Sequence, residues 1–150
     1  MAIDPIVKNK KAQFQYNLLE RYEAGIELKG AEVKSLRDKK VSINESYARV
    51  IEGEVFLFGM NISPYEPASR SNHPPTRRRK LLLHKREIRR IAGKTTEKGL
   101  TLVPVELYFK DGLAKVQIAV AKGKTRFDKR EAIKKRDDER AMKREMRRRR

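Results

Sequence analysis

Two Gly-Lys-Thr triplets have the residue types that could cradle a phosphate group. They occupy residues 93–95 and 123–125. A phosphate-binding loop of this kind also needs a glycine five residues before the glycine of the triplet, because the backbone N–H groups of the whole loop wrap the phosphate. The chain has Ile88 and Ile118 at those two positions. The triplets therefore do not predict a nucleoside triphosphate site.

The histidines and carboxylates do not predict a catalytic site or a metal site either. His73 and His84 are separated by a proline pair and a run of basic residues. Asp and Glu are scattered, mostly next to Lys or Arg, as is typical of solvated ion pairs. The sequence therefore predicts a protein that is not an enzyme and that uses no cofactor and no metal ion.

The residues from 123 to 150 are dominated by cations. They include fourteen Lys or Arg and six Asp or Glu, which gives this segment a net charge of +8. The segment has no strand-like run and few apolar residues, so it cannot build a hydrophobic core of its own. Clustered cations attract polyanions strongly. The composition predicts a nucleic-acid-binding arm, with a solubilising tail as the alternative.

The first 122 residues are basic as well, since they carry +10 of the total charge of +18. Both parts are therefore expected to face the same anionic partner. An anionic membrane is the other candidate, but the chain has no apolar run near the roughly 18 residues of a membrane span and no basic helix with an aromatic face. Nucleic acid is the better candidate, and no membrane partner is expected.

The composition also indicates a location in the cell. The chain has no cysteine, so it forms neither a disulfide nor a thiolate metal site, which fits a reducing compartment. Residues 1–11 lack the apolar stretch of a secretory signal. A cytoplasmic protein is expected.

Two β-hairpins are the clearest predicted elements. Their strand-like runs are 46–51 with 54–62, and 101–109 with 113–121. The turns between them, Glu52-Gly53 and Lys110-Asp111-Gly112, contain a glycine that adopts a positive φ without steric cost. Pro104 cannot donate a backbone hydrogen bond, so its strand is expected to be an edge strand or a bulged one.

The other predicted elements are one strand, two helices and a loop. A strand is expected at 14–23, preceded by a basic leader on the surface. An amphipathic helix is expected to begin at Gly30, and a basic-faced helix is expected from His84 to Ala92, ending near Gly93. Four prolines make 63–76 an irregular loop.

Together these elements predict a mainly β protein with short helices. Five or six short strands fit a small closed antiparallel barrel of the oligonucleotide-binding (OB) type. The barrel is expected to span residues 1–122 and the basic tail residues 123–150.

The leucine triplet 81–83 and Glu23 are candidate contacts on the barrel surface. Side chains alternate along a strand, so three consecutive leucines cannot all face the interior. At least one is expected beside the arginines of 77–79, as an apolar contact for a base or a ribose. Glu23 has two interpretations: it pairs with a neighbouring cation, or it accepts hydrogen bonds from bases or 2′-hydroxyls.

Several longer motifs are spread over the chain. They are Asn9-Lys10-Lys11-Ala12, Tyr22-Glu23-Ala24-Gly25-Ile26, residues 30–37, Asn61-Ile62-Ser63-Pro64-Tyr65, residues 79–83, and Gly123-Lys124 with Asp128-Lys129-Arg130. Together, from about Asn9 to Arg136, they closely resemble the small protein B family, the bacterial partners of transfer-messenger RNA in trans-translation. The combined resemblance is far more specific than any single motif.

The resemblance implies a six-stranded OB-like barrel that binds the tRNA-like domain of transfer-messenger RNA at its elbow, so that protein and RNA together mimic a tRNA. In the family, the RNA is charged with alanine, carried by the elongation factor that delivers aminoacyl-tRNA, and brought to stalled ribosomes. The tail is implied to be disordered when free and to become a helix in the vacant messenger channel, near the decoding centre. The protein makes no bonds itself, and a monomer is expected.

The resemblance also implies two sets of site residues, matched by position. The RNA-facing set is Asn9, Lys10, Glu23, Lys34, Arg37 and Leu82. The ribosome-directed set in the tail is Lys124, Asp128, Lys129, Arg130, Lys134 and Arg136. Some members have an aromatic residue near the position of Asp138, where this chain has an acidic cluster at 137–139. Ile133 and Met142 are therefore the expected apolar contacts of the tail.

Two other functions remain open from the sequence. A ribosomal or assembly protein that binds ribosomal RNA permanently would have the same basic composition and the same barrel and arm. An RNA-modifying enzyme is disfavoured, because the sequence predicts no active site.

Overall fold

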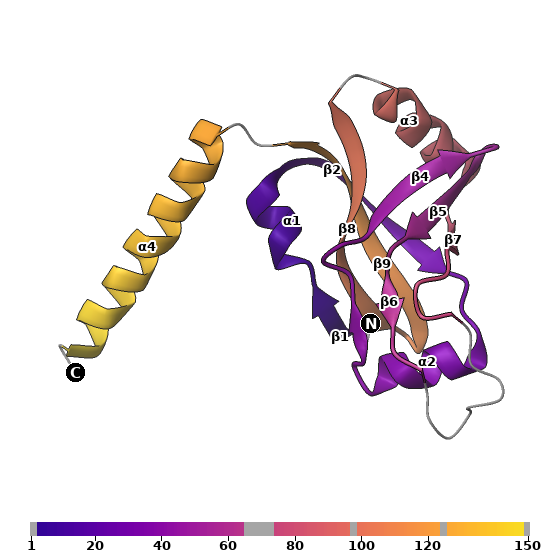
Figure 1. Ribbon diagram of the computed structural model, residues 1–150, viewed down its shortest axis with the longest axis horizontal. Coiled ribbons are helices and arrows are strands. Elements are labelled where there is room, and N and C mark those ends of the chain that lie inside the picture. The colour runs from indigo at the N-terminus through magenta and orange to yellow at the C-terminus, as the bar shows by residue number, and fades with distance from the viewer. Residues whose placement is uncertain (1–2, 65–73, 97–98, 124–125, 149–150) are drawn as a thin grey trace.

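The computed structural model of the chain describes a mainly β body, with short helices around it and a long helix at the C-terminus (Figure 1). The described residues are 3–64, 74–96, 99–123 and 126–148, without the side chains of 126–132 and 148. The mainly β fold with short helices agrees with the sequence prediction.

The body is built on one large antiparallel sheet. Its strands are β1 (Ile3–Lys8), β2 (Tyr16–Ile26), β4 (Tyr47–Ile51), β5 (Glu54–Phe58), β7 (Arg79–Leu82), β8 (Leu100–Lys110) and β9 (Leu113–Gly123). They pair in the order β1-β8-β4-β5-β7-β2-β9, and β9 also pairs with β8. The sheet therefore closes on itself as a ring, with β1 attached to β8.

The ring closes through one short contact. β4 meets β8 only at the pair Ala48–Leu102, whereas β1 pairs along the last part of β8, from Glu106 to Lys110. The strands β3 (Val41–Ser42) and β6 (Asn61–Ile62) form a separate two-stranded sheet.

Both predicted hairpins are confirmed. β4 and β5 turn through Glu52 and Gly53, with φ angles of +50° and +77°. β8 and β9 turn through Asp111 and Gly112, with φ angles of +51° and +81°. Positive φ at both central residues gives the turn whose twist matches the strands.

Two details of the hairpin predictions are resolved by the structure. β5 ends at Phe58 and does not continue to Ile62, because Gly59 has a φ of +77° and a Cβ there would stand 2.9 Å from the carbonyl oxygen of Glu45. The register of β8 against β9 shifts between Pro104 and Glu106, so Pro104 lies at a bulge. It is not on an edge strand, since β8 has partners on both sides.

The beginning of the chain differs from the prediction. Residues Ile3–Lys8 form β1, and α1 (Lys10–Gln15) follows, so the strand predicted at 14–23 starts only at Tyr16. The alternation of Phe14, Tyr16 and Leu18 suggested a strand, but Asn9 starts a helix there by accepting a hydrogen bond from the backbone N–H of Ala12. The leader is therefore part of the packed body.

The two predicted short helices are present. α2 (Gly30–Arg37) buries Leu36 and exposes Lys34 and Arg37, as its amphipathic pattern predicts. The second helix was predicted to end near Gly93, but α3 (Lys85–Thr95) continues for two residues beyond it. A glycine inside a helix costs only about 1 kcal/mol, and the buried side chain of Ile91 holds this helix on the body.

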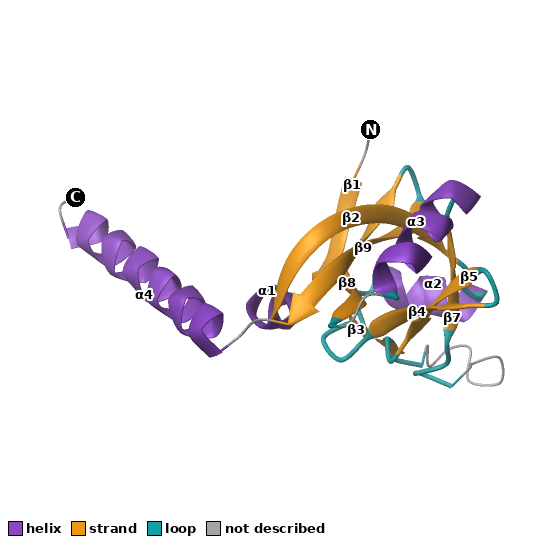
Figure 2. Cartoon of the chain, turned by 90° about the horizontal axis from the view of Figure 1, so that it is seen from above, coloured by secondary structure: helices purple, strands orange, loops and turns teal. Residues whose placement is uncertain are grey.

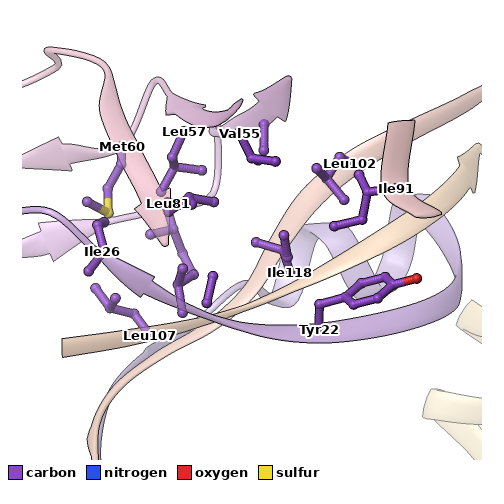
Figure 3. Close-up of a cluster of buried hydrophobic side chains, with 14 of the residues drawn as sticks. Tyr22, Ile26, Val55, Leu57, Met60, Leu81, Ile91, Leu102, Leu107 and Ile118 are labelled. Atoms are coloured by element: carbon purple, nitrogen blue, oxygen red, sulfur yellow. The ribbon is translucent and has the colours of Figure 1, made fainter. Parts of the chain in front are cut away.

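The core fills the inside of the ring (Figure 3). Every strand of the ring contributes to it, and so does α3. The fully buried contributors include Ala24, Val55, Leu57, Leu81, Ile91, Leu102, Leu107, Val116 and Ile118. Along β5, Val55 and Leu57 point inward while Glu54, Phe56 and Phe58 are only half-buried, so the latter three lie on the outer face.

Residues Arg126–Arg148 form α4, a helix of 23 residues that is about 34 Å long at the usual rise per residue. Figures 1 and 2 show it leaving the body past the end of β9 and extending away from it. The described side chains from 133 to 147 are all exposed. Among the described helices, none is long and apolar enough to cross a membrane.

The proline-rich loop predicted at 63–76 falls largely outside the described residues, as does His73.

Candidate nucleic-acid interface

A shelf on the outer surface is formed where β2 and β7 pair. Gly25 lies opposite Leu82, and a Cβ on Gly25 would stand 3.3 Å from the Cβ of Leu82. The leucine side chain therefore lies across bare glycine backbone and stays 52% exposed, while Leu81 is buried. The prediction that the triplet splits between core and surface is confirmed. Leu82 offers an apolar face of the kind on which a ribose or base packs.

Glu23 lies on the same face of β2, two residues before Gly25. Its carboxylate accepts hydrogen bonds from the Tyr108 hydroxyl and from the Lys110 ammonium, whose Nζ lies 3.2 Å from Oε1. These contacts, the one from Tyr108 first, hold the pKa of Glu23 below its usual range. Burial and the same carboxylate raise the pKa of Tyr108.

Both interpretations of Glu23 therefore agree with the geometry. The carboxylate is ionised and oriented by two donors, yet its side chain remains 38% exposed. A carboxylate has about four lone-pair sites, so two donors leave it able to accept further hydrogen bonds from bases or 2′-hydroxyls.

Glu23 and Leu82 line the same groove, which has a volume of about 550 Å³. Its polar lining also includes three lysines, a histidine and two further acids: Lys80, Lys85, Lys115, His84, Glu54 and Glu87. None of these belongs to the predicted set. Lys115 stands opposite Gly25 on β9, and Lys80 precedes Leu82 by two residues on β7. The alternation within β7 could have identified Lys80, but only the register of β9 against β2 identifies Lys115.

Lys34 and Arg37 are exposed on α2, outside this groove. The helix is anchored by Glu32, which is buried and accepts hydrogen bonds from Arg77 Nε at 3.2 Å and from Arg79 Nε at 2.7 Å. Burial opposes ionisation of Glu32, but the donors from Arg77, the Lys29 backbone and Arg79 hold its pKa below the usual range.

Arg79 is the most deeply buried cation described, with 1% of its surface exposed. Besides Glu32, its guanidinium donates to the carbonyl oxygens of Met60, Arg77 and Pro75 at 2.8, 2.9 and 3.0 Å. It therefore joins α2 to the segment that leads into β7, and it is not free to bind an anion from outside the chain.

Asn9 does not face solvent, in contrast to the prediction that it contacts RNA. It is 1% exposed, and its Nδ2 donates to the carbonyl oxygens of Ile43 at 3.2 Å and Pro104 at 2.8 Å. Its Oδ1 caps α1. Asn9 therefore positions the helix whose first residue, Lys10, is exposed.

The tail residues that were predicted to be ribosome-directed fall into two groups. The side chains of Lys124, Asp128, Lys129 and Arg130 lie outside the described part of the structure. Ile133, Lys134 and Arg136 are exposed on α4. The guanidinium of Arg136 lies 5.9 Å from the centre of the Phe14 ring, at the outer limit of a cation–π contact, and so links α4 to α1.

Because the tail is helical, most of its described cations lie on one face of α4. At 3.6 residues per turn, five exposed cations fall within an arc of about 100°. This basic stripe consists of Arg136, Arg140, Lys143, Arg144 and Arg147. Asp137 borders the stripe, whereas Asp138 and Glu139 point elsewhere, so the acidic cluster of the sequence does not interrupt it. A helical projection of 133–147 could have identified the stripe from the sequence alone.

The described residues contain no group of three His, Asp or Glu side chains that could hold a metal ion. What they do contain is exposed cations on α1, α2, α3 and α4, and one groove with an oriented acid and an exposed leucine. This combination suits a polyanion that also carries bases and hydroxyls, as RNA does.

Comparison with known proteins places the chain in a family. A family model described as SmpB protein matches residues 6–148. The SsrA-binding protein of Persephonella marina is 53% identical over 146 residues, which are 97% of this chain and 93% of that protein. The SsrA-binding protein of Carboxydothermus hydrogenoformans is 55% identical over 142 residues, 95% of each chain.

The fold gives the same result. A solved structure described as "tmRNA-SmpB: a journey to the center of the bacterial ribosome" superposes with a TM-score of 0.70 and 51% sequence identity. The superposition covers 86% of this chain and 94% of the other. With sequence and fold shared over most of its length, the chain belongs to the SmpB protein family.

Proposed function

We propose that this protein binds transfer-messenger RNA and delivers it to stalled ribosomes, where the RNA directs the tagging of the unfinished peptide. The observation that carries the proposal is the similarity over nearly the whole chain, at 53% and 55% identity, to proteins named SsrA-binding protein. The related solved structure combines the same kind of protein with transfer-messenger RNA and the bacterial ribosome.

The strand ring acts as an OB-like barrel, and residues 1–122 form the RNA-binding unit. Its closed antiparallel strands, with α3 inserted between β7 and β8, support this assignment. Glu23 and Leu82 recognise the tRNA-like domain through the groove on β2 and β7. Lys10, Lys34 and Arg37 pair with phosphates around it. Asn9 caps α1 and so fixes the position of Lys10, the first residue of that helix.

Residues 123–150 form the ribosome-directed unit. Lys124, Asp128, Lys129, Arg130, Ile133, Lys134 and Arg136 contact ribosomal RNA near the decoding centre and in the messenger channel. The basic stripe of α4 suits a channel lined by phosphates. The tail is disordered in the free protein, because a helix whose described side chains are all exposed receives little stabilisation from packing. It becomes helical when the ribosome binds it.

The protein supplies recognition and carries out no reaction itself. It works as a cytoplasmic monomer without cofactor, metal or membrane partner, and the elongation factor that delivers aminoacyl-tRNA joins it through the RNA. The other candidate function is that of a permanent ribosomal or assembly protein. The identity of the RNA that copurifies with the chain distinguishes the two. One structured RNA of a few hundred nucleotides supports the present proposal, and bulk ribosomal RNA contradicts it.

A chain that ends at Lys122 is expected to keep its affinity for the tRNA-like domain within about tenfold, or about 1.4 kcal/mol. The groove and the cations of α1 and α2 all precede that point. The same chain is expected to fail in tagging, because it lacks the ribosome-directed unit. Titration of the isolated RNA domain measures the first property, and a reconstituted tagging reaction on stalled ribosomes measures the second. A larger loss of RNA affinity would contradict the division into two units.

Glu23→Ala is expected to lower the affinity for the tRNA-like domain by roughly tenfold or more, since hydrogen bonds to a charged group contribute about 1.5–3 kcal/mol. General attraction to phosphate predicts the opposite, because the substitution raises the net charge. Binding is measured by titration of the RNA domain at constant salt.

Glu54→Ala is the matched control for Glu23→Ala. Glu54 lines the same groove, and its removal changes the net charge by the same amount. It is expected to leave binding unchanged or slightly tighter. If Glu23→Ala bound as tightly as Glu54→Ala, Glu23 would have no specific contact with RNA.

A further inference from the structure

The outer face of the hairpin β4–β5 carries three aromatic side chains outside the groove described above. Tyr47, Phe56 and Phe58 alternate with the core residues of their strands, so they point away from the interior. Tyr47 lies opposite Phe58, and their rings stack with centroids 5.5 Å apart and planes inclined by 15°. Tyr47 remains 43% exposed, so one side of this stack is open to solvent.

Two arginines flank the aromatic rings. The Arg78 guanidinium lies 4.8 Å from the centre of the Phe56 ring, and Arg49 stands opposite Phe56 on β4. Both arginines are exposed. Within the described residues, neither has a carboxylate oxygen within 4.0 Å of its guanidinium nitrogens. Their charges are therefore available to an anion from outside the chain.

A groove of about 530 Å³ adjoins Tyr47. It follows the line where β4 and β8 are joined by a single pair, and the end of α3 forms its other wall. Tyr47 and Arg49 line it together with Thr95, Thr96 and Thr101. It shares no residue with the groove that contains Glu23 and Leu82. Its volume lies within the range typical of small-molecule sites and accommodates a nucleotide.

We propose that this surface, formed by Tyr47, Arg49, Phe56, Phe58 and Arg78, is a second RNA-binding surface that takes unpaired nucleotides. One base stacks on the open side of the Tyr47 ring, and the adjoining phosphates pair with Arg49 and Arg78. Surfaces that bind single-stranded nucleic acid combine these two features, because every base has a π face and every linkage has a charge. The two exposed arginines distinguish this face from an apolar protein-docking surface.

The stacked pair also has a structural role, since aromatic pairs across two strands stabilise a hairpin. Two substitutions of Tyr47 distinguish the structural role from RNA binding. A base needs a ring to stack on, so Tyr47→Phe keeps the surface intact and Tyr47→Leu removes it. Leucine keeps apolar area on the hairpin, so the melting temperature shows whether the fold has survived.

The test uses the full chain and an eight-nucleotide oligouridine that carries 4-thiouridine for photo-crosslinking. Binding is measured at about 0.4 M salt, where the attraction of the tail through charge alone is weak. Tyr47→Leu is expected to weaken binding about 5- to 100-fold, and Tyr47→Phe is expected to bind like the parent chain. In a second titration over a series of salt concentrations, Arg49→Gln is expected to reduce the slope of log affinity against log salt by about 0.7.

Mass spectrometry of the crosslinked parent chain is expected to place the uridine on β4 or β5. Crosslinks confined to the tail or to the groove with Glu23 would overturn the proposal, as would unchanged binding by a folded Tyr47→Leu variant. If that variant does not fold, the crosslink position and Arg49→Gln decide. The oligouridine has no tRNA-like structure, so the result is independent of which RNA the protein carries.

Discussion

Glu32→Ala is expected to lower the free energy of unfolding by about 3–5 kcal/mol, the usual cost of removing one partner of a buried ion pair. The substitution leaves Arg79 charged and buried, with only carbonyl oxygens around its guanidinium. It also releases Arg77 and the start of α2, whose backbone N–H at Lys29 donates to Glu32. Urea denaturation followed by circular dichroism at pH 7 measures the loss.

Two comparisons make this expectation specific. Glu54→Ala breaks the exposed pair with Lys80 at 2.9 Å and should cost less than about 1 kcal/mol. Because the pKa of Glu32 is lowered in the folded chain, its stabilisation is complete above the usual Glu range and is lost as the pH falls towards the lowered pKa. A cost for Glu32→Ala no larger than that for Glu54→Ala would show that Arg79 finds other partners.

Combined replacement of Asp128, Lys129 and Arg130 by alanine is expected to abolish peptide tagging while RNA binding and recruitment to the ribosome stay nearly intact. The three residues stand in the first turns of α4, close to where the tail leaves the body, and in the proposed function they direct the tail into the channel. The change removes a net charge of only +1 from a tail of +8, and the basic stripe of α4 still supplies general attraction.

A single-round tagging reaction on ribosomes stalled at a message end, with saturating RNA complex and two salt concentrations, measures the effect. Lys135→Ala is the matched control, since it removes the same net charge from a position outside the basic stripe. It is expected to produce a small defect that low salt restores. Near-normal tagging by the triple variant at low salt would mean that charge alone carries the function.

The features that could be predicted from the sequence are those decided within a few residues. Glu52-Gly53 and Asp111-Gly112 specify their hairpins because turn chemistry is local, and the spacing of Leu36 with Lys34 and Arg37 specifies the face of α2. The exposure of one leucine in the triplet follows from the alternation of a strand. These predictions needed no knowledge of what packs against each element.

The features that could not be predicted depend on partners far along the chain. The side-chain amide of Asn9 donates to carbonyl oxygens 34 and 95 residues away. A residue that was expected to contact RNA at the surface is therefore buried and holds three segments of the chain together. Arg79 lies in a basic run but is buried, because Glu32, 47 residues earlier, lies beside it. The partner of Glu23, Tyr108, is 85 residues away. Only the tertiary packing of helices and strands brings such residues together.

The single pair that joins β4 to β8 makes this line the weakest in the ring. The other junctions of the ring have more pairs: β2 and β7 have two, β5 and β7 three, β4 and β5 five, and β2 and β9 nine. Local opening of the strands is therefore expected to begin there, between β4 and β8. Such opening would widen the groove beside Tyr47 while the ladder that carries Glu23 stays closed. The groove beside Tyr47 can then adjust its width to what it binds, whereas Glu23 stays fixed on the nine-pair ladder of β2 and β9.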